Sequence, residues 1–261
     1  MKKPRVIIAM GESAGGKSTL LEAIKTVMKA KVIGAKVITD RFLLGQEVQA
    51  DIRREDFKEG FVKDKKVMVG EDSYVERWDD DPEKIQFGVL HGGPLNRVHE
   101  KMKQMMVEWD DPETVLLMEW TTGLDVEAEG FVLATENAEP LKQSGESVVE
   151  LLQGINLDEA EVTIVYIDAE FKWREERNRR RLALREGGLP EEAFAAYFPD
   201  GGELTKEIAE GLPKGVEFIF YDNNYDGSER FTKEMLEIAL GVIDGNRHVE
   251  GRIKRRKESE V

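Results

Sequence analysis

The sequence predicts an α/β fold, a three-layer sandwich around a five-stranded, mostly parallel sheet. Two observations predict the class: short runs of β-branched and aromatic residues recur along the chain, and helical patterns separate them. Strands that alternate with helices favour a parallel sheet with right-handed crossovers. A third observation, a glycine-rich loop between the first strand and the first helix, predicts which end of the sheet carries the site.

Five apolar runs are nearly continuous, as expected of strands buried on both faces. The predicted strands are residues 5–10, 31–38, 115–118, 162–167 and 216–221. Helical periodicity predicts helices over residues 17–29, 95–109, 170–185, 205–211 and 231–243. The connection from the second strand to the third, residues 42–113, is too long for a bare loop and must contain structure of its own.

Composition excludes several classes of protein. The 261 residues contain no cysteine, so disulfides and thiolate metal sites are excluded, and no apolar run approaches the length of a membrane span. A formal net charge of −15 argues against a broad nucleic-acid-binding surface. These features predict a cytoplasmic protein that binds neither membrane nor nucleic acid, and they are compatible with a homodimer.

The glycine-rich loop carries the strongest motif. It matches G-x-x-x-x-G-K-[ST] in full and lies between a predicted strand and a predicted helix. Its glycines let backbone N–H groups converge on phosphates, Lys17 reaches the β- and γ-phosphates, and Ser18 offers a hydroxyl ligand to Mg²⁺. The motif predicts a P-loop that binds a nucleoside triphosphate and Mg²⁺, formed by Gly11, Ser13, Ala14, Gly15, Gly16, Lys17, Ser18 and Thr19.

Arginines dominate the helix that follows the fourth strand. Arg177, Arg181 and Arg185 recur every four residues, and Arg174 precedes them on the same side. One interpretation is a salt-bridged surface helix, because Glu170, Glu175, Glu176 and Glu186 are at hand. The other is a mobile lid, hinged at Gly187-Gly188, whose arginines stabilise a transferring phosphoryl group.

The P-loop, the strand spacing and the arginine-bearing helix resemble nucleoside and nucleoside-monophosphate kinases. The resemblance implies that Arg177 and Arg181 are lid arginines and that the turn at Asp222-Asn223-Asn224 packs against the nucleotide base. It implies a kinase domain over residues 1–246, with an acceptor-binding insertion at 42–113 and a lid region at 170–204. Residues 247–261 are predicted to form a charged, frayed tail.

Carboxylates at strand ends supply the other candidates, because open α/β sheets bind ligands there. By resemblance, Asp40 is a catalytic base or acceptor ligand and Glu119 acts near the metal or its waters. Both also have an interpretation as carboxylates that cap the next helix. Asp168 is predicted to start the arginine-bearing helix. The proposed acceptor-binding set is Asp40, Arg41, His91, Arg97, Glu119 and Arg185.

Two functions follow. The first is a small-molecule kinase that moves the γ-phosphoryl group of ATP or GTP, with Mg²⁺, to a small acceptor such as a nucleoside or nucleotide. Its predicted catalytic residues are Lys17, Asp40, Arg177 and Arg181. The second is a P-loop switch regulated by a partner protein. A GTPase switch would carry Asp-x-x-Gly after the third strand and Asn-Lys-x-Asp after the fifth, and the sequence has neither.

Overall fold

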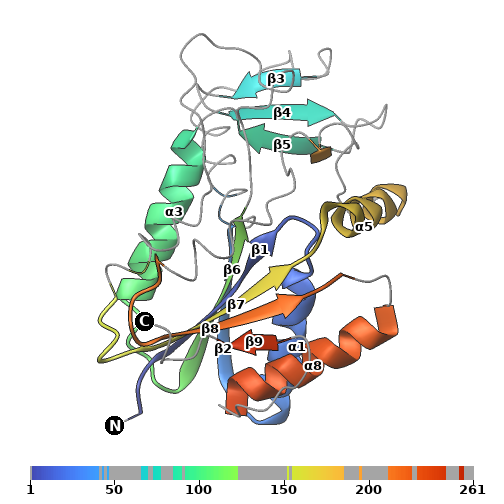
Figure 1. Ribbon diagram of the computed structural model, residues 1–261. Coiled ribbons are helices and arrows are strands. Elements are labelled where there is room, and N and C mark those ends of the chain that lie inside the picture. The colour runs from blue at the N-terminus through green and yellow to red at the C-terminus, as the bar shows by residue number, and fades with distance from the viewer. Residues whose placement is uncertain are drawn as a thin grey trace.

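The main sheet contains five parallel strands in the order β2-β6-β1-β7-β8 (Figure 1). The computed structural model describes residues 2–40, 43, 46, 66–69, 73–77, 85–89, 92–122, 152, 155–184, 194–195, 211–224, 228–244 and 253–255. The strands are β1 (Arg5–Glu12), β2 (Gly34–Thr39), β6 (Thr114–Thr122), β7 (Glu161–Asp168) and β8 (Val216–Asp222). The predicted α/β class and the five core strands are confirmed.

A sixth strand extends this sheet. β9 (Ile253–Arg255) pairs antiparallel with β8, placing Arg255 opposite Ile219. These residues belong to the tail for which a frayed end was predicted. The difference has a backbone cause: an edge strand offers unpaired N–H and C=O groups, and a short charged segment can pair with them whatever its side chains are.

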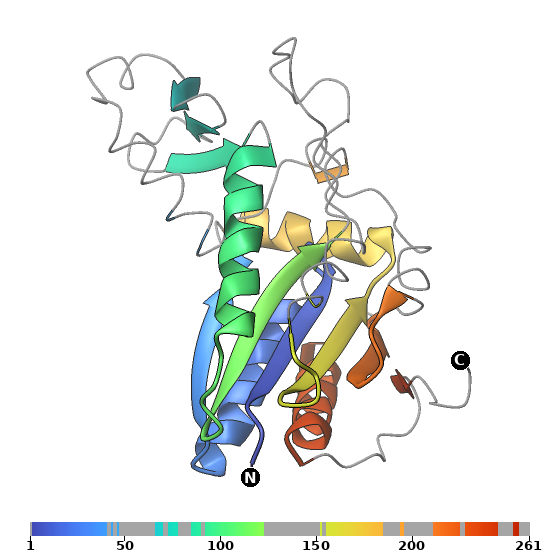
Figure 2. The same cartoon turned by 90° about the vertical axis from the view of Figure 1, so that its left-hand side faces the viewer.

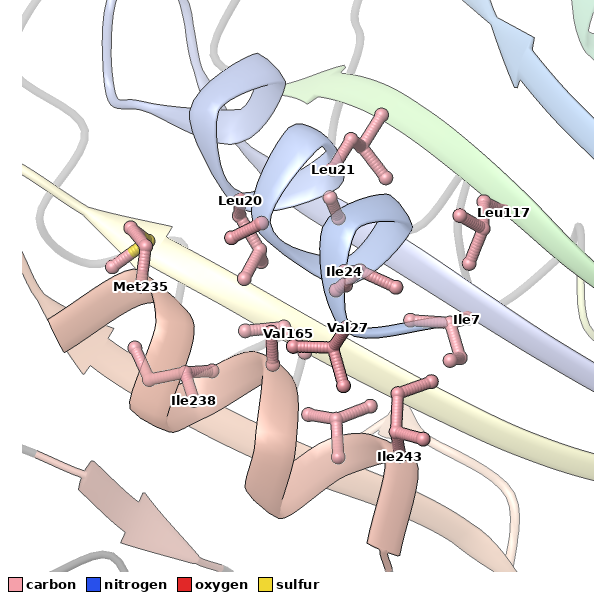
Figure 3. Close-up of a cluster of buried hydrophobic side chains, with 14 of the residues drawn as sticks. Ile7, Leu20, Leu21, Ile24, Val27, Leu117, Val165, Met235, Ile238 and Ile243 are labelled. Atoms are coloured by element: carbon pink, nitrogen blue, oxygen red, sulfur yellow. The ribbon is translucent and has the colours of Figure 1, made fainter. Parts of the chain in front are cut away.

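Helices cover both faces of the sheet. α1 (Lys17–Ala30) and α8 (Ser228–Asp244) lie on one face, and α3 (Gly92–Val107) lies on the other (Figure 2). Alternate residues of β1 serve the two cores, so Ile7 packs with α1 and α8 while Ile8 packs toward α3. Figure 3 shows the first core, in which side chains of both helices meet those of the strands.

Two further elements lie beyond the carboxyl ends of the parallel strands. α5 (Phe171–Ala183) crosses that end directly after β7 (Figures 1 and 2). The insertion contributes a separate antiparallel sheet on the same side, made of β3 (Lys66–Val69), β4 (Ser73–Arg77) and β5 (Ile85–Val89). The predicted helix at 205–211 lies outside the described residues except for Gly211. Within the described parts of the chain, no helix has the length and hydropathy required to cross a membrane.

The second strand begins three residues later than predicted because residues 31–33 terminate α1. The N–H of Ile33 donates to the carbonyl of Met28 at 2.9 Å, and that of Val32 donates to Lys29 at 3.2 Å. These are the two hydrogen bonds of a Schellman cap, which places its C′ residue in the left-handed region. Val32 occupies that position with φ 58° and is 93% exposed.

A β-branched residue at positive φ is strained, so Val32→Gly should stabilise the protein. Relief of about 1–2 kcal/mol of strain is partly offset by the larger entropy of glycine in the unfolded chain. We expect the free energy of unfolding to rise by roughly 0.5–1 kcal/mol in urea titrations. Val107→Gly, at the exposed end of α3, is the matched control and should destabilise. A loss of stability in Val32→Gly would contradict the strained cap.

Candidate functional site

The P-loop curls because glycine permits close contact and positive φ. Gly11 has φ 145°, and a Cβ there would lie 2.3 Å from the carbonyl oxygen of Ile167. Gly16 has φ 118° and is the N-cap of α1 without a side-chain hydrogen bond, and the first turn of α1 contains no acidic residue. The first N–H groups of α1 therefore face the loop with their partial positive charge uncapped by a side chain. An anion fits this position.

Lys17 is the buried cation of the site. Its side chain is only 4% exposed, and Nζ donates to the carbonyl oxygen of Glu12 at 2.9 Å. Burial lowers the pKa of Lys17, and the carboxylates of Glu119 and Asp40 oppose that effect. The ammonium group therefore lies against the Glu12 carbonyl and near the carboxylates of Glu119 and Asp40, where a phosphate can approach it.

Two strand ends bring carboxylates to Lys17. Thr39 of β2 pairs with Glu119 of β6, so Asp40 follows β2 at the same level of the sheet. The Oδ2 atom of Asp40 accepts a 2.7 Å hydrogen bond from the N–H of Thr121, which fixes its position. Asp40 is buried. The sequence prediction that these strand ends gather candidate groups agrees with this placement.

Glu119 contacts the P-loop hydroxyl. Ser18 Oγ donates to Oε1 and Oε2 of Glu119 at 3.1 and 3.2 Å. Burial raises the pKa of Glu119, and the nearby Asp40 charge adds to the effect, while Lys17 and Ser18 oppose it. Among the described residues no three His, Cys, Asp or Glu side chains form a metal cluster. A hydroxyl beside one carboxylate still suits Mg²⁺, which binds few protein oxygens together with substrate phosphates.

α5 presents two different faces. Toward the site, Arg177 Nη1 donates to the carbonyls of Ala14 and Gly15 at 3.3 and 3.4 Å, and Arg181 lines the pocket beside Lys17. Toward solvent, Arg179 and Arg180 pair with Glu176 at 2.6 and 3.1 Å. One face of this helix is therefore salt-bridged and the other is directed at the P-loop. The proposed hinge at Gly187-Gly188 lies outside the described residues, so the mobile lid stays a prediction.

The turn after β8 is hydrogen-bonded to the P-loop. Arg177 Nη2 donates to the carbonyl of Asn223 at 2.8 Å, and the Asn223 side chain donates to the carbonyl of Gly15. The N–H of Asn223 donates to the carbonyl of Asp168 at 2.7 Å, and Asn224 Oδ1 accepts from the N–H of Glu170. The asparagine pair thus joins the P-loop to the start of α5. Asp168 is the last residue of β7 and Glu170 is the N-cap of α5, so Asp168 does not start that helix as predicted.

Sequence reasoning missed the partner of Arg174. This side chain is fully buried, and Nε lies 2.9 Å from Glu12 Oε2 and donates to the carbonyl of Ala169 at 2.9 Å. Glu12 occupies a variable position of the P-loop motif, where an acidic residue gives no signal of burial. The heptad-like spacing of Arg174 from Arg181 was the one available hint that it faces inward.

Lys17, Asp40, Glu119 and Arg181 line one pocket of about 340 Å³. The P-loop supplies one wall, α1 another, the ends of β2 and β6 a third, and α5 closes it through Arg181. Its lining residues are Ser13, Ala14, Gly16, Lys17, Ser18, Leu21, Glu22, Val37, Thr39, Asp40, Glu119, Thr121 and Arg181. Thr19 is half-buried in the first turn of α1.

The side chains of four predicted residues lie outside the described part of the structure. Arg41, His91 and Arg185 lie outside the described residues. Arg97 is in α3, of which only the backbone is described at that position. Their proposed acceptor-binding roles stay predictions.

Comparisons with known proteins found matches among solved structures at low identity and low TM-score. No protein-family model matches the chain, and no curated protein matches its sequence. Among solved structures, a sugar kinase from Janibacter sp. has 12% identity and a TM-score of 0.41, covering 92% of this chain and 95% of its own. An APS kinase from Mycobacterium tuberculosis, in complex with AMPPNP and APS, has 14% identity and a TM-score of 0.41, covering 94% and 98%.

Because burial raises the pKa of Glu119, the substitution Glu119→Gln should increase the free energy of unfolding, and the increase should depend on pH. A carboxyl whose pKa is raised on folding contributes stability below its unfolded pKa, near 4.5, and this contribution is lost as pH rises through the folded pKa. The stability of Glu119→Gln relative to the parent protein should therefore increase from pH 4.5 upward and then level off. Urea titrations at several pH values measure it, with exposed Glu108→Gln as the control. A difference that is constant with pH would contradict the burial of a charged carboxyl.

Proposed function

We propose that this chain is a phosphotransferase that moves the γ-phosphoryl group of a nucleoside triphosphate to the hydroxyl group of a small acceptor. The observation that carries the proposal is that the P-loop, Asp40, Glu119 and Arg181 line the same pocket. A phosphate cradle alone would serve any P-loop protein. A buried carboxylate near that cradle, Asp40 at the end of β2, supplies what a hydroxyl acceptor requires.

The P-loop side of the pocket suits the triphosphate. The uncapped N-terminus of α1 and the Lys17 ammonium favour the β- and γ-phosphates. Ser18 and Glu119 would hold Mg²⁺, which when bound neutralises charge on the phosphates and orients them. ATP is the proposed donor, with GTP as the alternative, because no described group reads the base.

Arg177 and Arg181 suit different tasks. Arg177 is tied to P-loop carbonyls and to Asn223, so it supports the shape of the cradle and the turn proposed to pack against the base. Arg181 lines the pocket itself, near Lys17. Its guanidinium group is placed to stabilise negative charge that develops on the transferring group.

Asp40 suits the role of general base. As the acceptor oxygen attacks the γ-phosphorus, its proton passes to the Asp40 carboxylate, and the bond from that phosphorus to the β–γ bridging oxygen breaks. The products are a phosphorylated acceptor and a nucleoside diphosphate. The hydrogen bond from Thr121 holds the carboxylate in place for this transfer.

The charge of the pocket favours an acceptor without a phosphate of its own. Its described lining holds two cations, Lys17 and Arg181, and both lie beside the phosphate cradle. Three carboxylates share the pocket: Glu22, Asp40 and Glu119. A second anion would meet these carboxylates as well as the triphosphate, so a neutral polyol or nucleoside is the better match. We further propose that the insertion, residues 42–113, completes the acceptor side.

Nucleotide turnover with a panel of acceptors tests the proposal. Nucleosides and sugars are each compared with their monophosphates, and Lys17→Ala is the blank. We expect one neutral hydroxyl compound to raise the release of nucleoside diphosphate sharply and to become phosphorylated. Asp40→Asn should lower that stimulated rate by about 10²–10⁴-fold, the usual size of a general-base effect, with nucleotide affinity retained.

Other outcomes separate the alternatives. Stimulation by monophosphates alone would overturn the neutral acceptor but keep the kinase. Tight nucleotide binding with slow hydrolysis that no acceptor stimulates would overturn the kinase and favour a switch regulated by a partner.

A further inference from the structure

A buried ion pair lies directly behind the phosphate cradle. Glu12 is 4% exposed and Arg174 is fully buried, and 2.9 Å separates their charged atoms. Removing two such groups from water costs several kcal/mol per ion, and the attraction between them does no more than offset that cost. The pair therefore contributes little net stability to the fold. Its position beside the P-loop indicates a role in the site instead.

Glu12 belongs to the cradle itself. Its carbonyl oxygen accepts hydrogen bonds from Lys17 Nζ at 2.9 Å and from the N–H of Gly15 at 3.1 Å. Burial lowers the pKa of Lys17, and the Glu12 carboxylate is among the negative groups that oppose this effect. A negative group this close to an anion-binding loop would repel phosphates unless a cation neutralised it.

Arg174 supplies that cation and also starts the inward-facing row of α5. Arg174, Arg177 and Arg181 follow one another at spacings of three and four residues, so they share one face of the helix. Arg174 pairs with Glu12, and Arg177 donates to the carbonyls of Ala14 and Gly15. Arg181 lines the pocket. The ring of Phe171, 5.4 Å from the guanidinium carbon of Arg174, covers this first contact.

We propose that Arg174 is a positioning residue for nucleotide binding, which neutralises Glu12 inside the P-loop and fixes α5 so that Arg177 and Arg181 face the cradle. This rests on the proposed binding of a nucleoside triphosphate. The first half of α5 then acts as a fixed brace of the P-loop.

Calorimetric titration with ATP and Mg²⁺ tests the charge argument. Arg174→Met leaves the Glu12 carboxylate uncompensated and should weaken binding at least about tenfold, as expected of a unit charge near the phosphates. Glu12→Gln leaves the arginine charge and a hydrogen-bond acceptor, so it should bind at least as tightly as the parent. The double variant Glu12→Gln/Arg174→Met should return to within about threefold of the parent affinity. Arg179→Met, on the solvent face, is the matched control and should not change affinity.

A purely structural pair gives a different pattern. Both single variants would then weaken binding alike, and the double variant would not recover, which overturns the inference. Where Arg174→Met does not fold, Glu12→Gln alone decides, because a loss of affinity greater than threefold overturns the inference. A parent protein that binds no nucleotide overturns the proposed function, and the inference with it.

Hydrogen exchange tests the positioning argument. In Arg174→Met, amides of α5 should exchange faster than in the parent, while those of α8 should not change. Unchanged exchange in α5 would show that Arg174 does not fix the helix.

Discussion

The site depends on the burial of one ammonium group. Lys17 is withdrawn from water at the start of α1, so its charge requires oxygen atoms around it. The carbonyl of Glu12 supplies one, and the ends of β2 and β6 bring Asp40 and Glu119 close. Because parallel strands end at one edge of the sheet, groups that are 101 residues apart, Ser18 and Glu119, come within hydrogen-bond distance.

The same constraint explains the oxygen-rich pocket. The carboxylates that offset Lys17 in the folded protein are also the ones proposed as metal ligand and base, and their burial costs stability. The raised pKa of Glu119 reflects this burial. A site with buried charges of this kind is less stable than an apolar one, and the proposed binding of a phosphate with a metal ion would offset that cost.

The sequence predicted those features that local chemistry determines. The positive φ angles of the loop at Gly11 and Gly16 follow from its glycines, and buried strands follow from continuous β-branched runs such as 162–167. Nucleotide binding by this loop stays a prediction. Features that depend on contacts between distant parts of the chain were not predicted. An acidic residue at position 12 predicts a solvated loop. Its burial depends on Arg174, which lies 162 residues later in the sequence. β9 was not predicted because its pairing uses backbone groups. The start of β2 was predicted three residues too early because a Schellman cap can form around a valine.

In the proposed function, one pocket holds the triphosphate between the P-loop and the inward face of α5. A crystal structure with Mg²⁺ and a non-hydrolysable analogue of ATP would test this placement. We expect the triphosphate along residues 11–19, Mg²⁺ on Ser18 beside Glu119, and Arg181 at the γ-phosphate. A nucleotide bound elsewhere, or one whose γ-phosphate lies away from both Asp40 and Arg181, would contradict it.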